Sequence, residues 1–386
     1  MKNYLIKDLI SEISMGPFGS NIKVECFVDD GIPVLNGSNL DGFVLKEDSF
    51  RYVTEEKADS LGKSNAHKGD VVITHRGTLG QIIFIPENSK YDRYVISQSQ
   101  FRVKCNEKIL PQYLVYYFHT KIGQYKLLSN ASQVGVPALA RASTTFQKID
   151  IDVPSVEVQS KIVDLLEVLR KKIELNHKIS MNLEQQAFSL YKSMFTSDNQ
   201  PNGVLSDIAD ITMGQSPSGD SLNEENGTVF YQGRTDFGFR FPSVRLYTTE
   251  PKRMAVKNDV LLSVRAPVGD INVAIEDCCI GRGLAAIHSK NNRQSFVYYT
   301  TKSLYRAFDM FNGEGTVFGS INKAALNSMP IYIPDEKEID TFEELVSPMD
   351  KMILENHNEN VKLQKIRDGL LPKLMSGEID LTDIDI

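Results

Sequence analysis

The chain has 386 residues, 41% of them hydrophobic, and a formal net charge of -7 at pH 7. This length suffices for two domains of ordinary size, each with its own core. Because it contains no run of about 18 apolar residues and no charged leader before an apolar stretch, we expect neither a membrane span nor export. The four cysteines show no CxxC spacing, which suggests reduced thiols and a cytoplasmic location.

The net charge is unevenly distributed along the sequence. Residues 335–386 carry 6 lysines and arginines against 14 aspartates and glutamates, whereas the rest of the chain is close to neutral. A neutral domain can hold a basic face opposite an acidic one, which would suit a nucleic acid, or it can mix both signs evenly. Composition alone leaves both arrangements open.

The first 154 residues predict a mixed α+β domain with short, mainly antiparallel strands. A short amphipathic segment at residues 5–13 precedes a loop at residues 15–21. A strand-like run at residues 32–35 leads into the turn signal Asn36-Gly37-Ser38-Asn39. Further along, we expect a buried strand at 70–74, its hairpin partner at 81–85, a strand at 95–103 and a helix at 112–128.

Residues 155–197 predict one long helix. Apolar residues recur there at a spacing of three or four positions, and neither glycine nor proline interrupts residues 155–195. At 1.5 Å per residue such a helix is about 60 Å long. An apolar seam of that length requires a partner helix.

The same chain supplies that partner. Shifting the sequence by 180 residues aligns 336–375 with 156–195, and a proline precedes each segment, as is typical of helix starts. The two segments are therefore expected to pair as an antiparallel coiled coil. The predicted seam residues are Ile162, Leu169, Ile173, Asn176, Leu183, Leu190, Phe342, Met349, Ile353, Asn356, Leu363 and Leu370. Asn176, opposite or near Asn356, can set the register of the pair or can simply mark a hydrated patch.

The globular parts repeat as well. Residues 69–80 match residues 258–269, and Val115-Tyr116-Tyr117 recurs as Val297-Tyr298-Tyr299. We therefore divide the chain into a first recognition domain, a first helix, a second recognition domain, a second helix and an acidic tail. Their predicted bounds are 1–154, 155–197, 198–334, 335–376 and 377–386.

Polar and basic side chains gather in the loops of both predicted domains. Arginine can pair bidentately with guanine or phosphate, and glutamine can pair bidentately with adenine. The candidate DNA-contacting residues are Ser20, Asn21, Lys23, Arg76, Thr78, Gln98 and Gln100 in the first domain, and Gln215, Ser216, Ser218, Arg234, Arg265 and Arg282 in the second. Structural roles remain open: Arg76 and Arg265 can close a hairpin, and Gln98 and Arg282 can lie on an exposed strand face.

The common catalytic motifs are absent. The sequence contains no GxxxxGK[ST], HExxH or GxSxG, and neither the glycine-rich methyl-donor loop nor the Asn/Asp-Pro-Pro-aromatic motif of an amino-methyltransferase. His177 and His357 lie on the predicted helices, and two histidines fill too few positions of a zinc site. We therefore expect neither a catalytic site nor a bound metal in this chain.

Three motifs in a fixed order carry a family resemblance. They are GDVVITHRGTLG at residues 69–80, a box of Pro154, Glu157 and Gln159 before the first long helix, and LLPKLMSGEI at residues 370–379. Together with the internal repeat, this combination resembles the DNA specificity subunit of type I restriction-modification systems over essentially the whole chain. The second copy departs from it by having Ala266-Pro267 in place of Gly-Thr and by lacking the glutamine of the box.

The resemblance implies two target-recognition domains, each reading half of a bipartite site on double-stranded DNA and separated by the two helices. It implies a non-catalytic chain without a cofactor, which recruits two modification (adenine methyltransferase) subunits and, in the full complex, restriction (translocase) subunits. Those partners would use S-adenosylmethionine, ATP and Mg. From the residues alone, a protein-protein adaptor on a coiled-coil scaffold is an alternative, which apolar grooves would favour over basic faces. An enzyme with an unrecognised site is a third.

Overall fold

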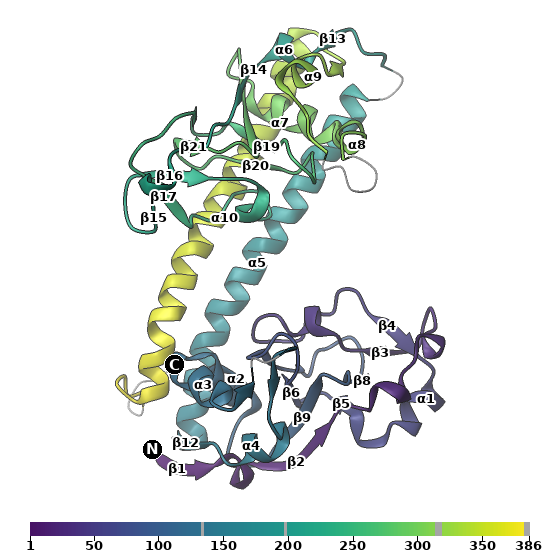
Figure 1. Ribbon diagram of the computed structural model, residues 1–386, viewed down its shortest axis with the longest axis vertical. Coiled ribbons are helices and arrows are strands. Elements are labelled where there is room, and N and C mark those ends of the chain that lie inside the picture. The colour runs from purple at the N-terminus through teal and green to yellow at the C-terminus, as the bar shows by residue number, and fades with distance from the viewer. Residues whose placement is uncertain (133–134, 197–198, 313–318, 382–386) are drawn as a thin grey trace. The chain divides into compact units, whose positions relative to one another are not determined.

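The computed structural model describes residues 1–132, 135–196, 199–312 and 319–381 (Figure 1). The chain divides into two compact units, one of residues 1–173 with 362–386 and the other of residues 174–361. Both mix helices with short, mostly antiparallel strands, and the α+β class is confirmed. Residue 197 of the predicted first helix, residue 198 and the end of the predicted acidic tail lie outside the described residues.

The first unit contains two four-stranded sheets, ordered β2-β9-β6-β7 and β4-β3-β8-β5, and β1 pairs separately with β12. Only the contact of β3 with β8 is parallel among the described pairs of these sheets. The strands are β1 (Lys2–Leu5), β2 (Ile10–Met15), β3 (Ile32–Val34), β4 (Arg51–Val53), β5 (Asn65–His67), β6 (Val71–Thr74), β7 (Ile82–Phe84), β8 (Arg93–Val95), β9 (Gln100–Cys105), β10 (Ala131–Ser132), β11 (Ala138–Leu139) and β12 (Asp150–Val153). The helices are α1 (Glu55–Ser60), α2 (Pro111–His119), α3 (Lys121–Leu128) and α4 (Ala142–Gln147).

The second unit repeats this architecture. The sheet β14-β22-β19-β20 corresponds strand for strand to β2-β9-β6-β7, and the sheet β15-β17-β16-β21-β18 again contains one parallel contact, between β16 and β21. The strands are β13 (Gly203–Val204), β14 (Ala209–Met213), β15 (Leu222–Asn223), β16 (Thr228–Tyr231), β17 (Leu246–Thr248), β18 (Met254–Ala255), β19 (Val260–Ser263), β20 (Ile271–Val273), β21 (Cys278–Ile280), β22 (Leu284–Ser289) and β23 (Pro330–Ile331). The shorter helices are α6 (Leu205–Ile208), α7 (Gln294–Ser303), α8 (Tyr305–Asp309) and α9 (Lys323–Asn327).

Two elements predicted from the sequence are split in the structure. The predicted strand 95–103 is in fact β8 and β9, which belong to different sheets, because Gln100 folds its Oε1 back to accept a hydrogen bond from the Ser97 N–H (2.8 Å). The predicted helix 112–128 is α2 followed by α3. Thr120 between them has an extended backbone, and its Oγ1 caps the first turn of α3.

The long helices are α5 (Val156–Phe195) and α10 (Glu336–Ser376), and each contributes residues to both units. Both cores depend on this sharing. Leu166 of α5 and Leu374 of α10 are fully buried in the core of the first unit. Tyr191 of α5 and Phe342 of α10 are buried in the core of the second. Each core is thus completed by one helix from each half of the sequence.

The helix pair is polar at its centre. Asn176 is 1% exposed, and its Nδ2 donates to Glu359 Oε2 (2.6 Å) and Asn360 Oδ1 (2.9 Å). Asn356 does not meet Asn176 but donates to Ser180 Oγ (3.2 Å). Because the higher-numbered residue of α5 pairs with the lower-numbered residue of α10, the helices are antiparallel in this unit. Of the predicted seam residues, Ile162, Asn176, Phe342 and Ile353 are buried, and Leu169, Ile173, Leu183, Leu190, Met349, Asn356, Leu363 and Leu370 are partly buried.

A buried arginine ties the loop before β17 to both long helices in the second unit. Arg240 is 4% exposed, and its Nη2 donates to Asp350 Oδ1 of α10 (2.7 Å). Its Nη1 lies 3.7 Å from Glu184 Oε1 of α5, and its guanidinium lies 3.4 Å from the ring centre of Tyr298. Phe43 is the equivalent residue of the first unit. Its carbonyl accepts a hydrogen bond from the Phe84 N–H of β7, as the carbonyl of Arg240 accepts one from the Val273 N–H of β20.

The repeated Gly-Asp and Asn-Asp pairs form the same turn in both units. Gly69 and Asn258 adopt φ of +84° and +75°, and the aspartates that follow, Asp70 and Asp259, are buried. In each case Oδ2 accepts a hydrogen bond of 2.9 Å from the backbone N–H three residues earlier. Desolvation raises the pKa of both carboxyl groups. This part of the sequence repeat therefore serves the turn before the central strand.

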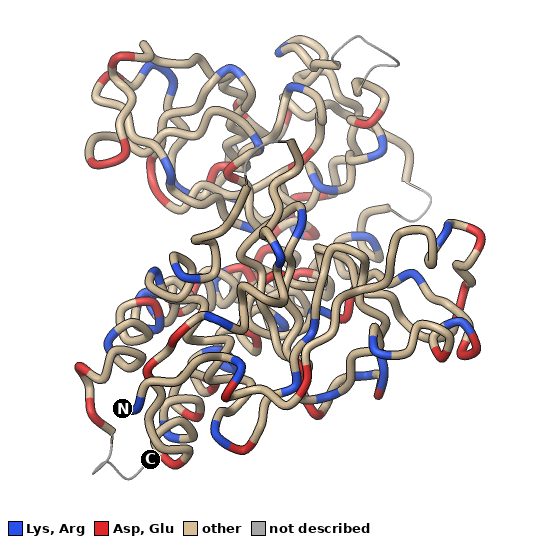
Figure 2. Tube along the Cα trace, turned by 60° about the horizontal axis from the view of Figure 1, so that its bottom comes forward, with Lys and Arg blue, Asp and Glu red and all other residues tan. Residues whose placement is uncertain are grey.

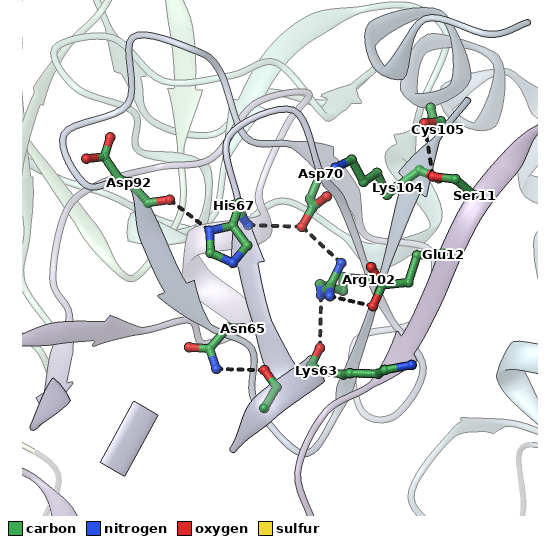
Figure 3. Close-up of polar contacts among 11 residues, drawn as sticks. Ser11, Glu12, Lys63, Asn65, His67, Asp70, Asp92, Arg102, Lys104 and Cys105 are labelled. Atoms are coloured by element: carbon green, nitrogen blue, oxygen red, sulfur yellow. Dashed lines mark hydrogen bonds and ion pairs between the residues drawn. The ribbon is translucent and has the colours of Figure 1, made fainter. Parts of the chain in front are cut away.

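In the first unit the turn aspartate is also paired with a buried cation (Figure 3). Arg102 of β9 places Nη1 3.2 Å from Asp70 Oδ2. Its Nη2 donates to Glu12 Oε1 of β2 (2.9 Å), and its Nε donates to the Lys63 carbonyl (2.9 Å). One guanidinium thereby joins two strands of the main sheet to the turn before β6.

Replacing Arg102 tests this arrangement. Arg102→Ala is expected to lower the free energy of unfolding by about 3–5 kcal/mol, because the buried Asp70 carboxylate loses its cation. The matched control is Arg93→Ala, whose partner Asp59 has a 66% exposed side chain. The control should lose only about 0–1 kcal/mol. Urea denaturation measures both, and equal losses would contradict the role assigned to Arg102.

Candidate nucleic-acid interface

Three loops of the first unit meet at one end of the sheet β2-β9-β6-β7. The last residues of β2 and β6 lie opposite the first two residues of β9, because both strands pair antiparallel with it. The loops that follow β2 and β6 therefore lie beside the loop that precedes β9. The approach is close: a Cβ at Gly16 would lie 1.9 Å from the carbonyl oxygen of Ser97. Loops far apart in the sequence thus form one surface.

The second unit brings the equivalent loops together. The last residues of β14 and β19 lie opposite the first two residues of β22. Single hydrogen bonds repeat as well, since the backbone N–H groups of His75 and Val264 donate to the loops before β9 and β22 (2.8 and 2.9 Å). Short 3-10 helices, Gly19–Asn21 and Gly219–Ser221, occupy matching places after β2 and β14. The candidate residues are therefore carried on two copies of one loop scaffold.

An open groove of about 640 Å³ lies among the loops of the first unit. Three residues predicted from the sequence line it, namely Asn21, Arg76 and Gln98, and they are joined by Phe18 and His75. Each predicted residue comes from a different loop. The other exposed candidates of this unit, Ser20, Lys23 and Thr78, are not among the residues that line the groove.

Gln100 does not fit the predicted role. Its side chain is 1% exposed, with Oε1 bonded to the Ser97 N–H and Nε2 donating to the Asn36 carbonyl (3.3 Å). An amide that satisfies two backbone groups inside the protein cannot offer both its atoms to a base edge. Gln100 therefore supports the loop that carries Gln98, and its amide is not exposed for the DNA contact predicted from the sequence.

In the second unit, hydrogen bonds connect the loops that carry the candidate DNA-contacting residues. Ser216 Oγ donates to Gln232 Oε1 (3.1 Å) and accepts from the backbone N–H of Arg282 (3.3 Å). Gln215 and Ser218 are exposed beside it on the loop after β14. The guanidinium of Arg234 forms an ion pair with Asp270, so part of its hydrogen-bonding capacity is occupied.

Three arginines differ from Arg234 in this respect. Arg76, Arg265 and Arg282 are exposed, and within the described ranges no hydrogen bond or ion pair involves their guanidinium groups. The backbones of Arg76 and Arg265 do belong to the turn, since they form isolated bridges with Ala138 and Ser320. The structural and ligand-binding interpretations are thus both compatible with the geometry: the backbone closes the turn, and the side chain is left available.

Sequence reasoning missed two residues of the first groove. His75 Nε2 lies 3.2 Å from the Gln98 carbonyl oxygen, and burial lowers the pKa of His75, so a neutral ring donates that bond at pH 7. Phe18 exposes 83% of its surface. The available signals were the position of His75 beside Arg76 and an aromatic residue placed between Pro17 and Gly19 in a loop.

Charged residues and possible metal ligands were also located. Figure 2 shows lysines and arginines interspersed with acidic residues along the trace of each unit. Among the residues that the structure describes, no three His, Cys, Asp or Glu side chains gather as metal ligands would. None of the described helices is both long and apolar enough to cross a bilayer.

The chain matches one family model twice. The family is described as the type I restriction modification DNA specificity domain, and the matches cover residues 21–185 and 202–366. The first match begins at the end of the 3-10 helix Gly19–Asn21 and ends within α5, and the second begins just before β13 and ends within α10.

Relatives and a solved structure extend the similarity over nearly the whole chain. The chain is 26% identical to a Methanocaldococcus jannaschii protein described as the specificity subunit of the type I restriction enzyme MjaX, covering 97% of this chain and 92% of the relative. It is 24% identical to the MjaIX specificity subunit of the same organism, covering 98% and 93%. The fold is similar to that of a type I restriction-modification S subunit from M. genitalium, with a TM-score of 0.59 at 16% identity over 97% of this chain and 95% of that one.

Two neighbouring glutamines test the assignment of roles in the first groove. Gln100→Ala should lower the free energy of unfolding by about 1–3 kcal/mol, because the chain loses the two partly buried hydrogen bonds of this amide to the Ser97 N–H and the Asn36 carbonyl, at about 0.5–1.5 kcal/mol each. Gln98→Ala, at an exposed position two residues away, should change it by less than about 0.5 kcal/mol. Thermal denaturation of both variants provides the comparison, and a neutral Gln100→Ala would refute the supporting role.

Proposed function

The chain belongs to the type I restriction modification DNA specificity family, and we propose that it reads a bipartite sequence on double-stranded DNA, with each unit contacting one half-site. The observation that carries this proposal is the duplicated loop scaffold. Both copies present exposed arginines at matching places, Arg76 and Arg265, while the side chains around them differ. A repeated scaffold with different side chains suits the reading of two different short sequences.

The rest of the assembly follows from the same premise. We propose that the chain is not itself catalytic and that it recruits two modification subunits, which methylate adenine with S-adenosylmethionine, and restriction subunits, which use ATP and Mg. The helices offer surface for such partners. Leu175 and Ile179, four positions apart on one face of α5 in the second unit, are 53% and 38% exposed. We also propose a cytoplasmic location, where all these components meet. Family membership does not favour the adaptor alternative.

Methylation mapping tests the reading of two half-sites. The chain is expressed with its modification subunit, and adenine methylation is mapped across the host genome by native long-read sequencing. A new motif of two short sequences with a fixed unread gap should appear only when the chain is present. A soluble, associated pair that yields no new motif would overturn the proposal.

Two arginine variants then assign the half-sites. Arg76→Ala should relax the sequence required in one half-site, and Arg265→Ala should relax the other, because a bidentate arginine contributes about 1–3 kcal/mol of discrimination at one base pair. Each variant is the control for the half-site that it leaves unchanged. If both variants relax the same half-site, or if neither variant relaxes a half-site, the assignment of one half-site to each unit is contradicted.

The helix pair is proposed to set the length of the unread gap, and Asn176 its register. Asn176→Leu should change the gap or the pairing of half-sites without abolishing binding by either unit, because the Glu359 carboxylate loses a donor at the seam. Asn182→Leu makes the same chemical change at an exposed position of α5 and should keep the gap. An unchanged gap together with a more stable Asn176→Leu chain would refute the register role.

A further inference from the structure

Phe18 is the most exposed large apolar side chain of the groove. It exposes 83% of its surface, and the same groove is lined by the polar side chains of Asn21, Arg76 and Gln98 as well as by Met15 and Leu61. An aromatic ring held in water beside hydrogen-bonding side chains gains contact area only when a flat apolar partner covers it. In a surface that meets DNA, the face of a base is such a partner.

The backbone that carries this ring is held on both sides. Pro17 before it is buried, and Gly16 lies so close to the loop before β9 that no Cβ would fit. After it, the Phe18 carbonyl accepts a 2.8 Å hydrogen bond from the Asn21 N–H, which closes the 3-10 helix Gly19–Asn21. The ring therefore projects from a loop that is pinned on both sides.

The second unit has the same backbone without the ring. Ser218 precedes the 3-10 helix Gly219–Ser221, and its φ and ψ of -59° and 140° match the -61° and 145° of Phe18. The Ser221 N–H donates to the Ser218 carbonyl (3.1 Å) as Asn21 does to Phe18. At this position of the loop, only the first unit carries an aromatic ring.

We propose that Phe18 inserts between two base pairs of the half-site read by the first unit and partly unstacks them. This inference rests on the proposed function. Pyrimidine–purine steps unstack most readily, so the first unit would prefer such a step at a position where no base edge is contacted. The second half-site, facing Ser218, would stay stacked.

The test uses the complex of the full chain with its modification subunits and duplexes that carry the methylated motif. 2-Aminopurine is placed in turn at positions of each half-site other than the methylated adenine, where the partner's chemistry can itself disturb stacking. With the wild-type chain, fluorescence should rise at one step of the first half-site and at none of the second. Phe18→Ala should abolish that rise and weaken binding about 10-fold to 100-fold.

Val24→Ala is the matched control, because Val24 is 80% exposed in the same unit and does not line the groove. It should leave both fluorescence and affinity unchanged. Phe18→Tyr keeps the ring and should retain the rise, while thermal melting checks that each variant is folded. Absence of a rise with the wild-type chain, or a Phe18→Ala variant indistinguishable from Val24→Ala, would overturn the insertion while leaving sequence-specific methylation intact. A wild-type complex that methylates no bipartite motif would instead overturn the proposed function.

Discussion

The packing of α5 against α10 is the constraint on which both units depend. The sheets β2-β9-β6-β7 and β14-β22-β19-β20 each pack in a core that includes residues of both long helices, such as Leu166 and Leu374 in the first core. Neither half of the chain can close its core with its own residues. The seam combines apolar contacts near its ends with a buried amide at Asn176. Such a polar centre disfavours shifted pairings, because a shift would leave Asn176 without its partners.

The turn before the central strand shows how a rigid frame and variable contacts coexist. Asp70 and Asp259 satisfy the same backbone N–H groups, but their further partners differ: Arg102 in the first unit and the ring of His288 in the second (2.6 Å). The loops at the end of the sheet inherit a fixed backbone from this frame. Their side chains can then vary without disturbing the fold, which suits a protein whose two halves meet different sequences.

The long helices and the repeat could be predicted from the spacing of residues. Apolar residues recur every three or four positions in the helices, and a second copy of the first helix follows 180 residues later. The breaks at Gln100 and Thr120 could not be predicted. Each depends on a side chain that accepts a hydrogen bond from a nearby backbone N–H group, and hydrophobic periodicity does not reveal such bonds. The candidate loops were found by their composition. That they lie side by side could not be predicted, because it depends on the antiparallel pairing of neighbouring strands with β9 and β22. For that reason Gln98 and buried Gln100 looked alike, and Phe18 went unnoticed.

The order in which the chain is made gives the shared helices a further consequence. Residues 1–173 leave the ribosome roughly 190 residues before the part of α10 that covers their core. At about 5–20 residues per second, this leaves the first unit incomplete for about 10–40 s. During that interval the apolar face of Ile162 and Leu166 has no helix from the second half to cover it. The first half to be synthesised is therefore the last to be finished, and its exposed face is where a chaperone would be needed.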